Sequence, residues 1–319
     1  MMEMVTLSIR AGSSDERRLF NGSSGLLPRW LQGRVARASI VRKTCMNPKR
    51  FTIRTCLIVA AMHLILAGGG IPVALAQKGS LAQAYEIIAS KHFVDLTHSF
   101  SPLTPVWKGF GQATFSLAAD PQTGRPYTIA RDGFRAFVYS MVGQYGTHID
   151  PPAHFDSNGM TVEEIPLKQM ILPLVVFDIT PMLKKDPNRA LTVDDIKVWE
   201  RTHGLVPAGS FAALRTDMYK DWDTNPERFK RYPFPAWSFE AIKFLYEKRA
   251  IVANGHESLD TDTSQDLKSE KWLLTHGHWQ IEGMAHLDEV PATGALIVVT
   301  WPKPKHGLGF PARAFAILP

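Results

Sequence analysis

The chain has 319 residues, and its 36 lysines and arginines exceed its 30 aspartates and glutamates, which gives a formal net charge of +6. Residues 1–76 hold 11 of the basic and 3 of the acidic side chains, so residues 77–319 keep 25 basic and 27 acidic side chains. The remainder therefore has no basic surplus of the kind that favours nucleic-acid binding, and we expect no nucleic-acid partner.

Residues 46–76 have the order of residue types found in a secretory signal peptide. A positively charged start precedes an apolar core over residues 57–66, and a small-x-small cleavage pattern ends at Ala76. We expect a periplasmic or secreted protein without a membrane anchor after cleavage; a retained anchor is the alternative. Residues 1–45 are then either a disordered extension or a stretch ahead of the true start at Met46.

Both cysteines, Cys45 and Cys56, precede the expected cleavage point. Residues 77–319 then contain no thiol, which excludes disulfides and cysteine catalysis and is compatible with an oxidising compartment. Their length suits one α/β domain with a full hydrophobic core.

The elements expected in the first half of this domain begin with a helix over residues 78–91, apolar on one face. A short strand follows over residues 93–96. Residues 99–132 are rich in proline, glycine and polar residues, which indicates loops and short strands near a substrate. Residues 134–142 are dense in aromatic and β-branched residues and predict a buried strand.

The second half predicts strands alternating with helices. We expect strands over residues 170–179, 210–216, 250–254, 295–300 and 312–318. Helices are predicted over residues 191–201, 238–248 and 267–277. Because the early region is also rich in strands, the pattern predicts an α/β fold with a mixed sheet and flanking helices.

Potential metal ligands are concentrated in residues 143–155. Residues two apart on a strand share a face, so His148 and Asp150 can reach one ion. Gly146 permits a sharp turn that returns Gln144 to the same ion. His154 follows two prolines and is either a further ligand or a base beside a metal-bound water. Imidazole and carboxylate groups bind divalent metals, which activate water and polarise carbonyl groups, so the run indicates amide, lactam or ester hydrolysis.

The run Gly146-Thr147-His148-Ile149-Asp150-Pro151-Pro152-Ala153-His154-Phe155 resembles the signature His-x-Gly-Thr-His-x-Asp-x-Pro-x-His-Phe of the metal-dependent cyclase family. That family includes kynurenine formamidases, which act in tryptophan catabolism, and isatin hydrolases. The resemblance extends over residues 93–318. It includes these further stretches: Asp95-Leu96-Thr97-His98, Leu214-Arg215-Thr216, Gly255-His256-Glu257-Ser258-Leu259-Asp260, and Gly277 to Leu287 with Glu282. It implies a swivelling β/α/β fold, a metal-activated water and a homodimer.

Two positions depart from the family pattern. Gln144 stands where the family has its first histidine, and a hard amide oxygen favours Mn²⁺ over Zn²⁺. Glu270 stands where members with two metals have a further histidine. We therefore expect one tightly held divalent metal and leave a second ion open. Glu282 is carried over from the resemblance as a site carboxylate.

We predict a metal-dependent amidohydrolase for a small aromatic amide, such as an N-formyl aniline or a cyclic lactam. His148 and Asp150 hold the ion with help from Gln144, His154 takes and returns the proton, and Glu282 orients the water or the leaving group. The alternatives are a non-catalytic periplasmic metal- or ligand-binding protein on the same scaffold, and a related lactonase or dehydratase. An aromatic substrate wall or ordinary core packing explains Trp107, Phe110 and Trp272.

Overall fold

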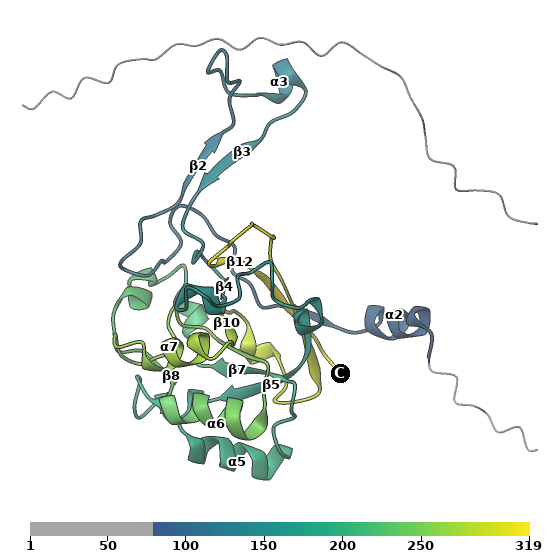
Figure 1. Ribbon diagram of the computed structural model, residues 1–319, viewed down its shortest axis with the longest axis vertical. Helices are drawn as coiled ribbons and strands as arrows, with labels where there is room; N and C mark the ends of the chain where they lie inside the picture. Colours follow the sequence, from purple (N-terminus) through teal and green to yellow (C-terminus); the bar gives the residue numbers. More distant parts are fainter. Residues whose placement is uncertain (1–78) are drawn as a thin grey trace, which may run out of the picture. The chain divides into compact units, whose positions relative to one another are not determined.

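The computed structural model describes residues 79–319 (Figure 1), so the predictions for residues 1–45 and 46–76 lie outside the described residues. The described residues belong to one compact unit. Among them, no helix has both the length and the apolar character that a membrane span requires.

A nine-stranded mixed sheet forms the centre of this unit. Its order is β1-β13-β11-β5-β7-β9-β10-β4-β12. The four central strands β5, β7, β9 and β10 run parallel to one another, and the strands on both sides join them in antiparallel pairs. The bounds are β1 Phe93–Asp95, β13 Arg313–Ile317, β11 Ala295–Thr300, β5 Ile171–Asp178, β7 Phe211–Arg215, β9 Ala253–His256, β10 Trp279–Glu282, β4 His148–Asp150 and β12 Phe310–Pro311.

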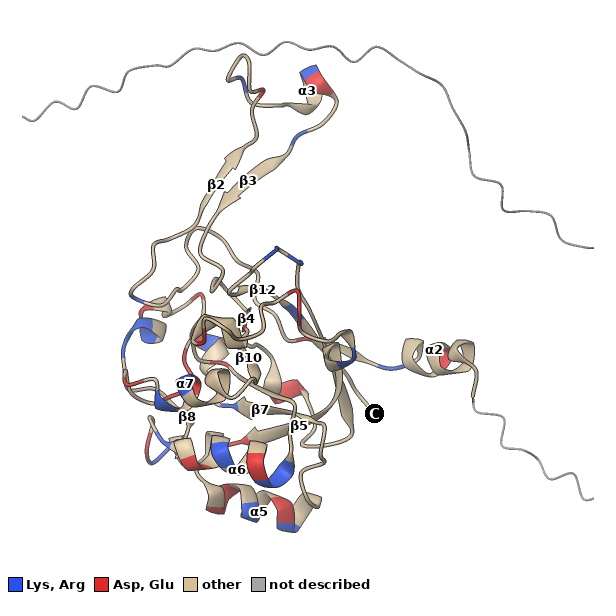
Figure 2. Cartoon of the chain, viewed as in Figure 1, with Lys and Arg blue, Asp and Glu red and all other residues tan. Residues whose placement is uncertain are grey.

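Three helices pack against one face of the parallel strands (Figure 1). They are α5 Val193–His203, α6 Phe239–Arg249 and α7 Lys268–Thr275. Helices α5 and α6 carry acidic and basic residues together (Figure 2), as solvated helices do. The predicted α/β fold with a mixed sheet and flanking helices is therefore confirmed. The remaining elements are α2 Leu81–Ala89, α3 Ile129–Asp132, α4 Thr180–Leu183, β2 Thr114–Leu117, β3 Phe137–Ser140, β6 Ala190–Leu191, β8 Ala236–Trp237, and the 3₁₀ turns η1 Pro152–His154, η2 Leu167–Met170, η3 Met218–Asp221, η4 Pro226–Lys230 and η5 Leu287–Glu289.

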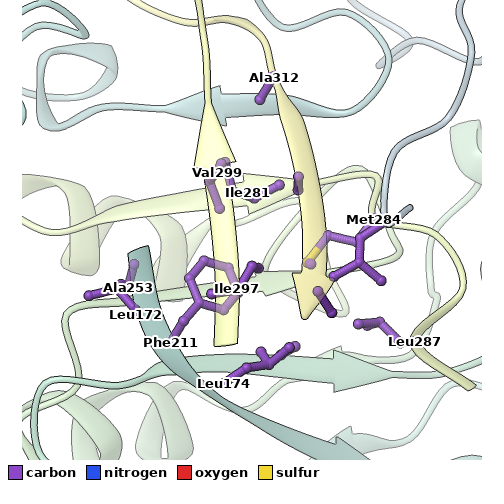
Figure 3. Packing of buried hydrophobic residues seen from close by; sticks show 14 of the residues in the cluster. Leu172, Leu174, Phe211, Ala253, Ile281, Met284, Leu287, Ile297, Val299 and Ala312 are labelled. Atoms are coloured by element: carbon purple, nitrogen blue, oxygen red, sulfur yellow. The ribbon is translucent and has the colours of Figure 1, made fainter. Parts of the chain in front are cut away.

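Side chains of the central strands alternate between two hydrophobic clusters because successive residues of a strand point to opposite faces. Leu174 and Phe211 face the cluster shown in Figure 3, where they pack with Ile281 and Ile297. Phe177, on the other face of β5, packs in the cluster that α5 and α6 cover. Burial on both faces is typical of parallel strands and explains why residues 170–179 are almost entirely apolar.

Two predicted elements lack the burial expected of them. Residues 134–142 predict a buried strand, but β3 pairs only with β2 in a two-stranded ribbon, and all four of its residues are exposed. The prediction of burial is wrong because apolar composition does not reveal whether a second layer covers a strand. Helix α2 lies within the predicted residues 78–91, yet none of its residues is buried among the described residues.

The contact of β9 with its neighbours gives a test of the packing. A Cβ atom at Gly255 would lie 2.6 Å from the Met284 sulfur and 2.8 Å from Cζ of Phe211. We expect Gly255→Ala to lower the free energy of unfolding by about 1–3 kcal/mol, because overpacking forces its neighbours to move. Urea denaturation measures this, with Gly111→Ala as control because nothing lies within 4 Å of its added Cβ. Equal stability of the two variants would contradict the described packing.

Candidate metal centre

The register between β4 and β10 brings the site together. His148 lies directly opposite Glu282 in this antiparallel pair, and Asp150 lies opposite Gln280. Directly opposed residues project on the same face of a sheet, so two ligands from the motif meet a carboxylate more than 130 positions away in sequence. The intervening residue Ile149 points to the other face and is buried in the hydrophobic cluster of Figure 3.

Three potential ligand atoms converge on this face. One atom each from His148, Asp150 and Glu282 lies within 4.8 Å of the other two, and all three residues are buried. His148 Nε2 is 3.6 Å from Asp150 Oδ2 and 3.6 Å from Glu282 Oε2. The sequence prediction that His148 and Asp150 share a face agrees with these positions.

The backbone orients the His148 ring for ligation. His148 Nδ1–H donates to the carbonyl oxygen of Gly146 at 2.9 Å, which directs Nε2 toward the two carboxyl groups. Gly146 adopts a φ of +68°, a left-handed conformation that a glycine reaches without strain. Asp150 Oδ1 is buried and has no hydrogen-bond partner among the described residues. A cation beside these groups would use both the imidazole lone pair and the carboxylate.

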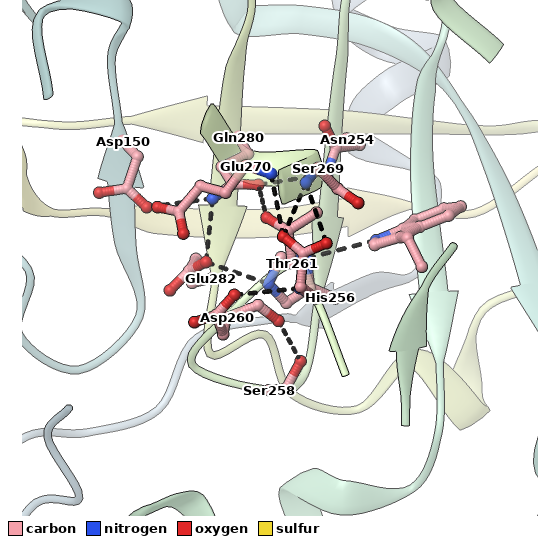
Figure 4. A network of polar contacts seen from close by, with 12 residues as sticks. Asp150, Asn254, His256, Ser258, Asp260, Thr261, Ser269, Glu270, Gln280 and Glu282 are labelled. Carbon is pink, nitrogen blue, oxygen red and sulfur yellow. Dashed lines mark hydrogen bonds and ion pairs between the residues drawn. The ribbon is translucent and has the colours of Figure 1, made fainter. Parts of the chain in front are cut away.

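A second layer of polar groups holds Glu282 (Figure 4). Gln280 Nε2 donates to Glu282 Oε1 at 2.9 Å and to Asp150 Oδ2 at 3.3 Å. His256 Nε2 lies 3.2 Å from Glu282 Oε1, while the Trp237 indole N–H donates to His256 Nδ1 at 3.3 Å. The indole therefore makes Nε2 the protonated nitrogen of His256, which donates to Glu282. Burial lowers the pKa of His256 to about 3, so this ring is neutral at physiological pH.

The pocket has an excess of buried carboxyl groups. Asp150, Asp260, Glu270 and Glu282 all line it, and no lysine or arginine does so in the described part of the chain. Burial raises the pKa of Glu270 and Glu282 well above the usual range and that of Asp260 to about 7. Burial also opposes ionisation of Asp150, but attraction to His148 lowers its pKa to about 2. Buried carboxyl groups in such number ionise only beside a positive partner, so the donor set fits a divalent metal.

The pocket itself has a volume of about 310 Å³. His154 and Gln144 line it beside the three potential ligands, so all five predicted site residues lie around one cavity. Its remaining wall is apolar and comes from Trp107, Phe110, Phe155, Leu259 and Leu267.

The aromatic residues considered from sequence divide between two places. Trp107 and Phe110 line the pocket, with ring centroids 5.2 Å apart. Trp272 instead packs against α6, where its ring lies edge-on to the ring of Phe239. A wall of aromatic and aliphatic side chains favours a flat, apolar ligand.

Gln144 faces the motif histidine and the loop before β12. Its amide nitrogen donates to the carbonyl oxygen of Leu308 at 2.7 Å and lies 3.4 Å from His154 Nδ1. Both neighbours of the amide nitrogen, Leu308 and His154, therefore belong to the chain itself, and the Gln144 side chain lines the cavity.

Three residues of the site have no role in the sequence analysis. Asp260 and His256 lie in the family-like stretch 255–260, and Gln280 precedes Glu282 by two positions. The available signal is alternation: Asn254 and His256 on β9, and Gln280 and Glu282 on β10, are polar at every second position of otherwise apolar strands. Such buried polar residues at strand spacing indicate a site on one face.

The chain is similar to several known hydrolases. The family model Cyclase matches residues 94–263, which include β4. Isatin hydrolase of Roseibium aggregatum is 31% identical over 208 residues, 58% of this chain and 76% of that protein. Kynurenine formamidase of Erythrobacter litoralis is 21% identical over 198 residues, 62% of this chain and 80% of that protein. Isatin hydrolase A from Labrenzia aggregata bound to benzyl benzoate, a solved structure, matches with a TM-score of 0.65 and 28% identity, over 75% of this chain and 99% of that one.

The similarity to isatin hydrolase structures extends over the curled mixed sheet and its flanking helices. The family match spans more than half of the 319 residues. The predicted family resemblance is thereby confirmed: the chain belongs to the cyclase family and is an amidohydrolase that acts on carbon–nitrogen bonds other than peptide bonds.

Proposed function

We propose that this protein hydrolyses a small aromatic amide, such as an N-formyl aniline, or a lactam fused to an aromatic ring. The observation that carries the proposal is the cluster of His148, Asp150 and Glu282 at the wall of a pocket with aromatic sides. The similarity to an isatin hydrolase and a kynurenine formamidase supports the same substrate class.

We assign one divalent metal to His148, Asp150 and Glu282. Two carboxylates and one imidazole favour Mn²⁺ over Zn²⁺, since carboxylate oxygens are hard ligands. When bound, such an ion lowers the pKa of a coordinated water toward ~7 and polarises a carbonyl oxygen. Glu270 and Asp260 add two carboxyl groups to the same pocket, and a second divalent ion would balance their charge.

The chain's own residues bind the substrate and move its protons. Trp107 and Phe110 hold the aromatic ring and exclude water from the pocket. His154 lines the pocket and donates to the substrate or the leaving group through Nε2. Glu282 orients the water or the leaving group, and its own position is held by Gln280 and His256. Gln144 completes the wall beside His154.

We also propose that the protein works outside the cytoplasm, since residues 46–76 have the pattern of a signal peptide. A second copy of the chain is the proposed partner. The β2–β3 ribbon, α3 and the link between α3 and β3 expose the large apolar side chains Leu117, Ile129, Phe134, Phe137, Val138 and Tyr139. An isolated two-stranded ribbon is marginally stable in water, so burial against a second subunit would stabilise it.

The dimer can be tested by a matched pair of substitutions. Val138 on β3 and Val198 on α5 are 51% and 49% exposed, so a lysine at either place fits the monomer equally well. We expect the wild type and Val198→Lys to be dimers and Val138→Lys to be a monomer. Light scattering coupled to size-exclusion chromatography measures the mass; a monomeric wild type, or a dimeric Val138→Lys, would contradict the interface.

Metal binding is expected to depend on the motif histidine. His148→Ala removes the ligand between two carboxylates, so the variant should lose the ion while its circular dichroism spectrum stays that of a folded protein. Elemental analysis after purification without added metal gives the stoichiometry. His203→Ala, an exposed histidine at the end of α5, is the control and should keep one ion per chain. Full metal content in His148→Ala would refute the ligand assignment.

Catalysis is tested separately from metal content. The Mn²⁺-loaded protein should release acid from an N-formyl aniline or a fused aromatic lactam. His154→Gln should lower kcat by about 10²–10⁴-fold, the usual contribution of general acid–base catalysis, while it keeps the ion. His203→Gln should match the wild type. If the wild type binds both compounds and hydrolyses neither, the non-catalytic binding protein is the better description; product analysis distinguishes a lactonase or a dehydratase.

A further inference from the structure

We infer that Gln144 positions His154: its amide N–H donates to Nδ1 and fixes the neutral ring in the tautomer that carries its proton on Nε2. His154 then offers the substrate a hydrogen-bond donor, and its Nε2 cannot bind a metal. This inference deepens the proposed function and rests on it for the role of His154, but the tautomer is a property of the resting protein.

The orientation of the Gln144 amide follows from its partner. The carbonyl oxygen of Leu308 can only accept a hydrogen bond, so the amide atom 2.7 Å away is the nitrogen. That same nitrogen lies 3.4 Å from His154 Nδ1. An amide nitrogen carries two hydrogens, one for each of these partners. Two N–H groups cannot face each other favourably, so Nδ1 is the acceptor.

Close backbone packing holds the amide in this place. A Cβ atom at Gly309 would lie 2.0 Å from Gln144 Nε2 and 2.7 Å from its Cδ. A Cβ atom at Gly143 would lie 2.4 Å from the carbonyl oxygen of Gly309. Only glycines at both positions allow the segment before β4 and the loop before β12 to approach this closely. The amide of Gln144 is therefore confined between Leu308 and His154.

The consequence for His154 follows from the chemistry of imidazole. A neutral ring has one donor and one acceptor nitrogen, so an accepting Nδ1 places the proton on Nε2. No hydrogen bond joins Nε2 to another group among residues 79–319, and His154 lines the pocket. With a metal in place, His148 takes the opposite tautomer, with Nδ1–H on Gly146 and the lone pair on Nε2. One pocket thus contains one imidazole arranged as a ligand and one arranged as a donor.

Nuclear magnetic resonance of the histidine rings tests this inference without substrate. The protein is labelled with ¹⁵N- and ¹³C-histidine and loaded with Zn²⁺, which is diamagnetic. His154→Gln identifies the His154 signals by their disappearance. At a pH where the ring is neutral, wild-type His154 should show a protonated Nε2 and an accepting Nδ1. A protonated Nδ1, or the signature of a metal on Nε2, would overturn the inference.

Two substitutions at position 144 separate positioning from metal ligation. In Gln144→Glu the carboxylate accepts from Nδ1–H, so the tautomer should invert. In Gln144→Met the Nδ1 resonance should move to that of an acceptor nitrogen without a donor, and the ion should remain. Gln122→Met, in an exposed loop, should change neither signal. An unchanged tautomer in Gln144→Glu, or loss of the ion in Gln144→Met, would refute the positioning role.

The result is independent of the hydrolysis test. A wild type with the Nε2–H tautomer that hydrolyses no amide would overturn the proposed function and leave the Gln144 contact intact. A wild type that hydrolyses the amide with the opposite tautomer would overturn only the inference about Gln144. If Gln144→Glu does not fold, Gly309→Ala serves in its place, because its Cβ displaces the amide and should give the Nδ1 shift expected of Gln144→Met.

Discussion

The pairing of β4 with β10 is the contact on which the site depends. It sets His148 opposite Glu282 and Asp150 opposite Gln280, while Ile149 and Ile281 pack together in the core on the opposite face. A slip of one residue would turn the ligands into the hydrophobic cluster and the isoleucines into the pocket. The cost of burying polar groups without partners makes that slip unfavourable, so the hydrophobic core maintains the geometry of the ligands.

The same arrangement explains why a cation fits this site. Asp150 and Glu282 are 1% and 4% exposed, and Glu270 and Asp260 add two further buried carboxyl groups. Hydrogen bonds from Gln280 and His256 satisfy only part of the carboxyl oxygens. Without a metal, the carboxyl groups must take up protons, as the raised pKa of Glu270 and Glu282 indicates. A divalent ion that bound the folded site and not the unfolded chain would also stabilise the fold.

Sequence reasoning succeeds where the chemistry is local. His148, Asp150 and His154 lie in one short run, and strand spacing alone places the first two on one face. Glu282 came from family resemblance, because nothing local connects it with β4. His256 and Gln280 are harder still, since their proximity depends on which strands become neighbours in the sheet. The strand predicted over 134–142 shows the opposite failure: its residues have strand composition, but their burial depends on a covering layer that composition does not specify.

Three histidines around this pocket show how the environment of one ring nitrogen determines what the other can do. Nδ1 of His148 meets a carbonyl oxygen, Nδ1 of His256 meets an indole N–H, and Nδ1 of His154 meets the amide of Gln144. The first leaves a lone pair for a metal, and the second makes a neutral donor that holds Glu282. Gln144 stands where the resemblance places a histidine, and in our inference it supplies an N–H for the third ring. One imidazole and two carboxylates still lie within 4.8 Å of one another, a donor set that fits one divalent ion.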